Sequence, residues 1–389
     1  MKFKRIFLII LDSLGVGAMP DAKKFNDENA NTLRSILTSK KVNIPNLKKL
    51  GFTNLSDLEE YHNSKFNGLV MKMSELSNGK DTMTGHWEFM GIKTTKPFVT
   101  FTEHGFPKEL IDELEKRTKH KIIGNKAASG TEIIEELGPQ QLKDKSLIVY
   151  TSADSVLQIA AHEEVIPVDE LYKFCEIARE LCMKPEWLVG RVIARPFIGE
   201  PGSFKRTSNR HDYALAPSED SVLDFMQDAH LATISVGKIF DIFDGKGLDE
   251  SNKTISNEDG MNKTIDMVKN RDFNGLCFVN LVDFDAVYGH RRNAIGYAEC
   301  LEEFDVQLGE LLANLKDDDL LMLSADHGND PNYSGSDHTR EYVPLVIYYN
   351  QLKEGKLLDT RASFADIGAT ISANFNIKMP KIGKAIELE

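Results

Sequence analysis

The stretch 320–328 reads Leu-Leu-Met-Leu-Ser-Ala-Asp-His-Gly, an apolar run that leads directly into Asp326 and His327. A continuous apolar run of this length is typical of a strand buried on both faces, as in a parallel sheet covered by helices. Similar runs recur at Ile6–Leu11, Leu147–Tyr150, Leu231–Val236, Leu276–Leu281 and Val343–Tyr348. Segments of helical period lie between the runs, at Lys108–Lys116, Asp169–Leu181 and Tyr297–Leu315. This alternation predicts an α/β fold.

Charged or imidazole side chains follow three of these runs where each strand should end. Asp12 follows the first run, and Asp283 and Asp285 close the run that begins at residue 276. Asp326 and His327 follow the run quoted above. In open α/β sheets the ligand site lies beyond the carboxyl ends of the strands. We therefore predict that these side chains meet at one edge of the sheet.

The residue types at this edge suit a metal ion. His338 follows His327 by eleven residues, on a loop rich in Gly, Ser and Asn. Carboxylate oxygens and imidazole nitrogens together form a mixed oxygen and nitrogen metal site. Asp283 and Asp285 are expected on one face of their strand, with His290 in the loop beyond it. The alternative, for each segment taken alone, is a polar loop whose histidines only hydrogen-bond to the backbone.

A further segment, Lys80-Asp81-Thr82-Met83-Thr84-Gly85-His86-Trp87-Glu88, predicts the start of a helix after a loop. Threonine is a good N-cap, and Glu88 is expected early in the helix. The free N–H groups and positive dipole end of a helix N-terminus favour phosphate. The Thr84 hydroxyl could act there as a nucleophile if a metal lowers its pKa, and a plain capping threonine is the alternative.

Composition excludes several classes of protein. The chain has 389 residues with 41% hydrophobic and 28% charged side chains, which predicts a soluble globular protein of two or three domains. A net charge of -13 argues against nucleic acid as a partner. No run approaches the ~18 apolar residues of a membrane span. Four scattered cysteines predict free thiols and a cytoplasmic location, and nothing indicates an obligate protein partner.

The combined pattern resembles the alkaline phosphatase superfamily and, within it, the phosphopentomutase family. The resemblance rests on Asp12 after the first strand, Thr84 in its KDTMTGHWE segment, Asp285 and His290 at D-x4-H spacing, Asp326 with His327, and His338. It extends to the stretch YTSADSVLQIAAHEE at 150–164 and covers essentially the whole chain.

The resemblance implies an alkaline-phosphatase-like core, with a mostly parallel sheet between helices, and Thr84 as the catalytic nucleophile. It also implies two Mn²⁺ ions per chain, with Mg²⁺ or another divalent ion as an alternative. One ion would be held by Asp12, Asp326, His327 and the oxygen of Thr84. The other would be held by Asp285, His290 and His338.

No residue of this ligand set lies between Thr84 and Asp285, and so long a gap suggests an inserted domain. Pro97 marks a plausible exit from the core, and Ala216-Pro217 a plausible return. We predict a metal-binding catalytic core at 1–99 and 215–389, and an inserted α+β cap domain at 100–214 that binds substrate.

The predicted cap contains a basic segment. Residues 184–210 carry six cationic and two acidic side chains, a balance of +4 in a chain of net charge -13. A solvated basic face is the plain alternative. Because a phosphosugar is expected as the substrate, we predict that Arg191 and Arg206 contact its phosphate or sugar. Lys238 is a further candidate contact from the core, and Asp154 a candidate acceptor for a sugar hydroxyl.

The implied activity interconverts the 1- and 5-phosphates of ribose or deoxyribose, in nucleoside catabolism and pentose salvage. It would proceed through phosphorylated Thr84 and a pentose 1,5-bisphosphate. Glucose 1,6-bisphosphate or ribose 1,5-bisphosphate would then act as an activator. The alternatives are a phosphohydrolase of the same superfamily, a phosphoglycerate mutase, which uses a serine nucleophile, and a noncatalytic metal-binding protein.

Overall fold

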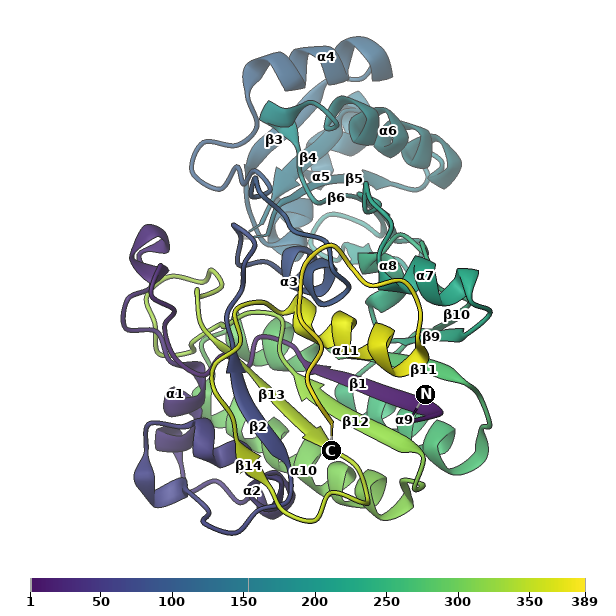
Figure 1. Cartoon of the computed structure of the whole chain (residues 1–389). Coiled ribbons are helices and arrows are strands. Elements are labelled where there is room, and N and C mark those ends of the chain that lie inside the picture. The colour runs from purple at the N-terminus through teal and green to yellow at the C-terminus, as the bar shows by residue number, and fades with distance from the viewer. Residues whose placement is uncertain (1, 153, 389) are drawn as a thin grey trace. The chain divides into compact units, whose positions relative to one another are not determined.

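The computed structural model describes residues 2–152 and 154–388, and the chain divides into two compact units (Figure 1). The first unit comprises Met1–Pro97 and Ala216–Glu389, and the second comprises Phe98–Leu215. We call them the core unit and the inserted unit, and each is described by itself.

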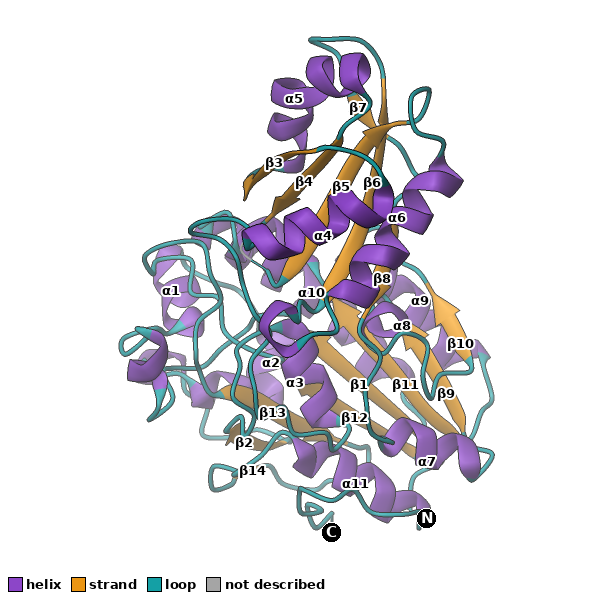
Figure 2. Cartoon of the chain, turned by 90° about the horizontal axis from the view of Figure 1, so that it is seen from above, coloured by secondary structure: helices purple, strands orange, loops and turns teal. Residues whose placement is uncertain are grey.

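An eight-stranded sheet runs through the core unit (Figure 2). Its strands, in spatial order, are β10 (Glu250–Asn252), β9 (Ala232–Val236), β11 (Gly275–Leu281), β1 (Arg5–Leu11), β12 (Asp319–Ser324), β13 (Val343–Tyr348), β2 (Leu69–Met73) and β14 (Lys356–Leu357). Every neighbouring pair is parallel except the two pairs that β13 makes. The predicted mostly parallel sheet is therefore confirmed.

The three central strands decide where functional side chains can meet. β11, β1 and β12 lie side by side, and all of their residues are buried. In their register Leu11 pairs with Leu281, and Ile10 pairs with Ser324. The carboxyl ends of the three strands are thus almost level, and the residues that follow them emerge at one edge of the sheet.

Helices cover both faces of the core sheet (Figures 1 and 2). One face carries α1 (Thr32–Ser39), α2 (Pro45–Leu50), α9 (Asn257–Asn270) and α10 (Ala294–Asn314). The other carries α3 (Thr82–Phe89), α7 (Val222–Asp228), α8 (Ile239–Ile242) and α11 (Ala365–Phe375). Because both faces of the sheet are covered, the central strands do not alternate polar and apolar residues. This explains their largely apolar sequence.

The inserted unit has a six-stranded sheet of its own. It consists of β3 (Ile122–Ala127), β4 (Leu147–Thr151), β5 (Val156–His162), β6 (Arg191–Ile198) and β7 (Lys205–Arg206) in that order, with β8 (His211–Ala214) also paired to β6. Successive residues of β4 enter different apolar clusters, as strand geometry requires. Leu147 and Val149 pack with α4 (Lys108–Thr118) and α6 (Val168–Leu181), whereas Ile148 and Tyr150 pack with α5 (Gly130–Asp144).

Two general features of the described residues bear on function. None of their helices is both long enough and apolar enough to cross a membrane. All four cysteines are free thiols in buried positions.

Candidate metal centre

The carboxyl edge of the core sheet gathers most of the predicted ligands. Among the described residues, the ligand atoms of Asp12, Asp326 and His327 all lie within 4.8 Å of one another. Those of Asp285, His327 and His338 form a second such group. His327 therefore belongs to both groups, and Asp12, Asp285, Asp326 and His327 lie at one edge as expected, whereas Asp283 belongs to neither group.

The first cluster is almost completely shielded from solvent. Nε2 of His327 lies 3.3 Å from Oδ2 of Asp326 and 3.5 Å from Oδ1 of Asp12. These two carboxylate oxygens are buried and have no hydrogen-bond partner among the described residues. Nδ1–H of His327 donates to the carbonyl of Gly328 at 3.0 Å, so Nε2 is the ring nitrogen that faces the carboxylates. Two buried carboxyl groups and an imidazole nitrogen that converge in this way form a donor set that fits a cation.

We call Asp285, His290 and His338 the second cluster, because here too a carboxylate oxygen lies close to imidazole nitrogens. Oδ2 of Asp285 lies 3.1 Å from Nε2 of His290 and 3.5 Å from Nε2 of His338. The two Nε2 atoms are 3.1 Å apart. Nδ1–H of His290 donates to the carbonyl of Ser336 at 2.7 Å, and that of His338 to the carbonyl of Lys80 at 3.0 Å. Backbone carbonyls at Nδ1 orient histidines in this way when Nε2 binds a metal.

Three groups of the two clusters, Asp12, Asp285 and His327, have strongly shifted pKa values. Burial raises the pKa of Asp12 well above its ordinary value, and the carboxylates of Asp326 and Asp285 raise it further. Burial opposes the ionised form of Asp285 too, but His338 and His290 hold its pKa well below the ordinary value. Burial would lower the pKa of His327, yet Asp326 and Asp12 raise it well above normal. These shifts describe concentrated negative charge, which a divalent cation would balance.

Asp285 and His290 are brought together by a π-helical turn, η5, at Phe284–Gly289. The N–H of His290 donates to the carbonyl of Asp285 at 3.0 Å, five residues back along the chain. The prediction that Asp283 and Asp285 share a strand face is wrong, because β11 ends at Leu281 and Asp283 has helical dihedral angles. Oδ2 of Asp283 instead accepts the N–H of Asn257, at the start of α9, at 2.7 Å.

Thr84 lies in the first turn of α3 and is fully buried. The N-cap is Asp81, whose Oδ1 accepts the N–H of Thr84 at 3.0 Å and whose Oδ2 accepts its hydroxyl at 2.6 Å. The expectation of a threonine cap with Glu88 early in the helix is thus wrong. Glu88 lies near the helix end, and its carboxylate accepts the N–H groups of Leu76 and Ser77 at 2.8 and 2.6 Å.

Two glycines allow close packing around Thr84. A Cβ atom at Gly85 would collide with the carbonyl of Asp326, so only glycine lets this turn of α3 approach the end of β12. A Cβ atom at Gly79 would lie 2.9 Å from Oγ1 of Thr84. The loop before α3 therefore lies directly over the Thr84 hydroxyl.

Two polar residues of this site were missed as functional residues in the sequence. Nδ1–H of His86 donates to the carbonyl of Thr82 at 2.8 Å and lies 3.3 Å from Oδ2 of Asp326. Nδ2 of Asn280 donates to Oδ2 of Asp12 at 2.8 Å. A polar side chain within the apolar run of β11 was the available signal for Asn280.

The predicted substrate residues belong to other segments of the chain. In the inserted unit, the Arg191 guanidinium is 3.2 Å from Oδ2 of Asp154 and 3.6 Å from Asp212. Arg206 is exposed on β7. Burial, together with the charges of Arg210 and Arg206, lowers the pKa of Arg195 to about 10, so guanidinium groups are crowded here.

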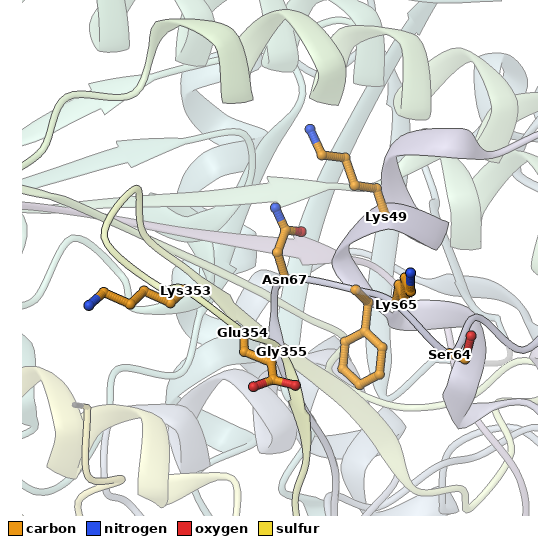
Figure 3. A pocket seen from close by; sticks show the side chains of 8 residues that line it. Lys49, Ser64, Lys65, Asn67, Lys353, Glu354 and Gly355 are labelled. Carbon is orange, nitrogen blue, oxygen red and sulfur yellow. The ribbon is translucent and has the colours of Figure 1, made fainter.

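Lys238 lies in the core unit and lines a cavity of about 250 Å³ together with Asp283 and Asn257. None of the predicted metal ligands lines this cavity. Another hollow, of about 470 Å³, is lined by Lys49, Ser64, Lys65, Phe66, Asn67, Lys353, Glu354 and Gly355 (Figure 3). Lys49 and Lys353 point in different directions, so their charges do not converge on one ligand (Figure 3).

Comparison with known proteins agrees with this geometry. The model of the metalloenzyme superfamily matches residues 4–379. The chain is 59% identical to a phosphopentomutase of Clostridium botulinum and 58% identical to one of Clostridium beijerinckii, in each case over 99% of this chain and 98% of the relative. The PH0037 protein from Pyrococcus horikoshii shares the fold at 14% identity, with a TM-score of 0.50 over 99% of this chain and 100% of that one. The superfamily match together with the ligand clusters supports dependence on divalent metal. The chain is an isomerase of the phosphomutase type and belongs to the phosphopentomutase family.

Proposed function

We propose that this protein interconverts the 1- and 5-phosphates of ribose and deoxyribose by passing a phosphoryl group through Thr84. The observation that carries this proposal is one buried hydroxyl in the first turn of α3, where the next residue, Gly85, packs directly against the backbone of Asp326, whose buried Oδ2 has no hydrogen-bond partner among the described residues. The substrate class is supported by relatives of 57–59% identity that are named phosphopentomutases. The pathway served would be nucleoside catabolism and pentose salvage.

Two Mn²⁺ ions fit the two clusters, and Mg²⁺ or another divalent ion could take the same ligands. In this proposal Asp12, Asp326, His327 and the oxygen of Thr84 hold one ion, and Asp285, His290 and His338 hold the other. His327 is assigned to the first ion because its Nε2 lies within 3.5 Å of both Asp326 and Asp12. When bound, the two ions would offset the negative charge of the phosphoryl group during transfer.

The chain's own residues would carry the phosphoryl group in two steps. Phosphorylated Thr84 gives its phosphoryl group to the free 5-hydroxyl of ribose 1-phosphate, or to the 1-hydroxyl of ribose 5-phosphate. The Oγ–P bond breaks as the new O–P bond forms, and a pentose 1,5-bisphosphate results. Thr84 then accepts the phosphoryl group from the other end. In the unphosphorylated chain Asp81 accepts the Thr84 hydroxyl at 2.6 Å and so orients Oγ.

The inserted unit would bind the part of the substrate remote from the metals. We assign Arg191 and Arg206 to phosphate or sugar oxygens, Asp154 to a sugar hydroxyl, and Lys238 to a contact from the core unit. Arginine suits this role because its planar group of donors matches phosphate geometry. The protein would work in the cytoplasm, as its four free thiols favour a reducing compartment.

The decisive experiment supplies the protein with Mn²⁺, ribose 5-phosphate and a trace of glucose 1,6-bisphosphate. Ribose 1-phosphate should form, with phosphothreonine at Thr84 seen by mass spectrometry. Free phosphate as the main product would identify a phosphohydrolase, and no reaction would identify a noncatalytic metal-binding protein.

A second experiment tests the activator. Protein that has been treated with phosphatase and repurified should be almost inactive until a sugar bisphosphate is added. A monophosphate can only lose its phosphate to bare Thr84 and leave as free sugar, whereas a bisphosphate loads Thr84 and leaves as a monophosphate. Full activity at once, without phosphothreonine, would rule out the phosphoenzyme cycle.

A further inference from the structure

Arg292 lies just beyond the π-helical turn and donates hydrogen bonds to an unusual number of acceptors. They are the carbonyls of Gly289 at 3.1 Å, Asp330 at 3.0 Å, Gly335 at 2.5 Å and Asp337 at 3.0 Å, and the side-chain Oδ1 of Asn329. All these partners lie in two segments, the end of the π-helical turn and the loop at 329–338.

These two segments carry the ligands of the second cluster. The turn carries Asp285 and His290, and the loop ends at His338. Asn329 continues the connection, because its Nδ2 donates to Oδ1 of Asp285 at 2.7 Å. A Cβ atom at Gly289 would lie 2.9 Å from Nδ2 of Asn329, so this side chain packs tightly against the turn.

The backbone at Arg292 is strained. Its φ of +54° lies in the left-handed region, which is unfavourable for a residue with a side chain. Glycine would adopt this φ freely, so the local conformation does not account for an arginine at this position. The half-buried guanidinium and its five hydrogen bonds do account for it.

We propose that Arg292 is a positioning residue that sets the metal affinity of the Asp285–His290–His338 cluster without touching the ion. This inference rests on the ligand set proposed above. The separations of 3.1 and 3.5 Å between the Asp285 oxygen and the two imidazoles depend on how the loop is held against the turn. Without the guanidinium the loop can shift, and the three ligands no longer converge on one point.

Arg292→Gly is the sharpest test, because it removes the guanidinium and relieves the strained φ at the same time. Arg291→Ala is the matched control, since it removes the same charge from the exposed neighbouring position. Mn²⁺ binding to the metal-free full chain is titrated by calorimetry and by electron paramagnetic resonance. We expect affinity for one of the two ions to fall by about 10–100-fold in Arg292→Gly, and neither to change in Arg291→Ala.

Activity supplies a second readout that a general loss of stability would not produce. Saturating Mn²⁺ should restore kcat in Arg292→Gly, while the Mn²⁺ concentration for half-maximal rate rises. If Arg292→Gly folds poorly, Arg292→Lys keeps the charge and the stem but loses the planar group of donors, and it should weaken the same ion.

Wild-type affinity for both ions in either folded variant would overturn the inference, and so would equal weakening of both. Wild-type protein that binds fewer than two ions would overturn the proposed ligand set and the inference with it. The number of ions bound by the wild type therefore tests the proposed ligand set, and the affinities of the variants test the role of Arg292.

Discussion

The carboxyl edge of the core sheet and the surface of β6 in the inserted unit carry opposite charge and are built in different ways. At the core edge, carboxylates and imidazoles follow three parallel strands whose ends are level. On β6, Arg191 and Arg195 lie four residues apart and so share one face of a strand. The comparison shows that a chain with a net charge of -13 contains two regions of opposite local charge, one suited to cations and one to anions.

The largest expected effect is at the core edge. Thr84→Ala should lower kcat by about 10⁴-fold or more, because no phosphoenzyme can form without Oγ. The fold should remain intact, which circular dichroism checks. Thr84→Ser is the matched control and should keep part of the activity and a phosphorylated hydroxyl. Near-normal turnover by folded Thr84→Ala would remove Thr84 from the mechanism.

Asp12→Asn should act in opposite directions on stability and metal binding. Since the pKa of Asp12 is raised in the folded chain, its ionised form destabilises metal-free protein as the pH rises above the unfolded carboxyl pKa. Without metal, Asp12→Asn should therefore be more stable than wild type at pH 7 by on the order of 1 kcal/mol, and equal to it near pH 3.

With Mn²⁺ present, the order should reverse, because Asp12→Asn loses a ligand of the first ion. Urea unfolding in chelator and in Mn²⁺ measures both effects on the same samples. A variant less stable than wild type in chelator at pH 7 would contradict the view that these carboxylates are unbalanced without a cation.

The inserted unit should respond more mildly. Arg191→Ala should raise KM for ribose 5-phosphate by about 10–100-fold, the loss expected for one charge-assisted hydrogen bond, and leave Mn²⁺ binding unchanged. Lys205→Ala removes the same charge from an exposed position of the same unit. An equal rise of KM in Lys205→Ala would assign the effect to overall charge rather than to a contact.

The last effect, on stability and not on activity, concerns Asp212, which faces the arginines. Burial would raise its pKa, but Arg210, Arg191 and Arg195 hold the pKa below the ordinary value. A lowered carboxyl pKa stabilises the fold above the unfolded pKa, and this stability is lost as the pH falls through the folded pKa.

Asp212→Asn should therefore lower the free energy of unfolding by about 1–2 kcal/mol at pH 7, with the difference shrinking at pH ~3. Urea unfolding at both pH values tests this, with Glu186→Gln, at an exposed carboxylate of the same unit, as control. A difference that does not depend on pH would show that the ion pairs are not its source.

The central strands could be predicted because their runs are apolar throughout, apart from Asn280 in β11. β2 was missed because Lys72 breaks its run, and in the structure Nζ of Lys72 donates to the carbonyl of Val16 at 3.0 Å. The reversed direction of β13 leaves no mark in the composition of its strand. Asp12 could be placed at the edge of the sheet because it directly follows a strand whose run was recognised.

Other parts of the site depend on packing between distant segments. His86 approaches Asp326 only because α3 lies against the end of β12, a contact that no local pattern encodes. The π-helical turn was missed for a different reason. Its hydrogen bond spans five residues, whereas apolar periodicity reveals only the spacing of ordinary helices and strands.

That turn also makes the length of its segment as important as its sequence. Between Asp285 and His290 the chain has one residue more than an α-helical turn would contain. Deleting any one of the four intervening residues would remove this five-residue hydrogen bond and shift the histidine relative to Asp285, although both side chains would remain. Natural variants of this segment should therefore exchange residues freely only where the number of residues stays the same.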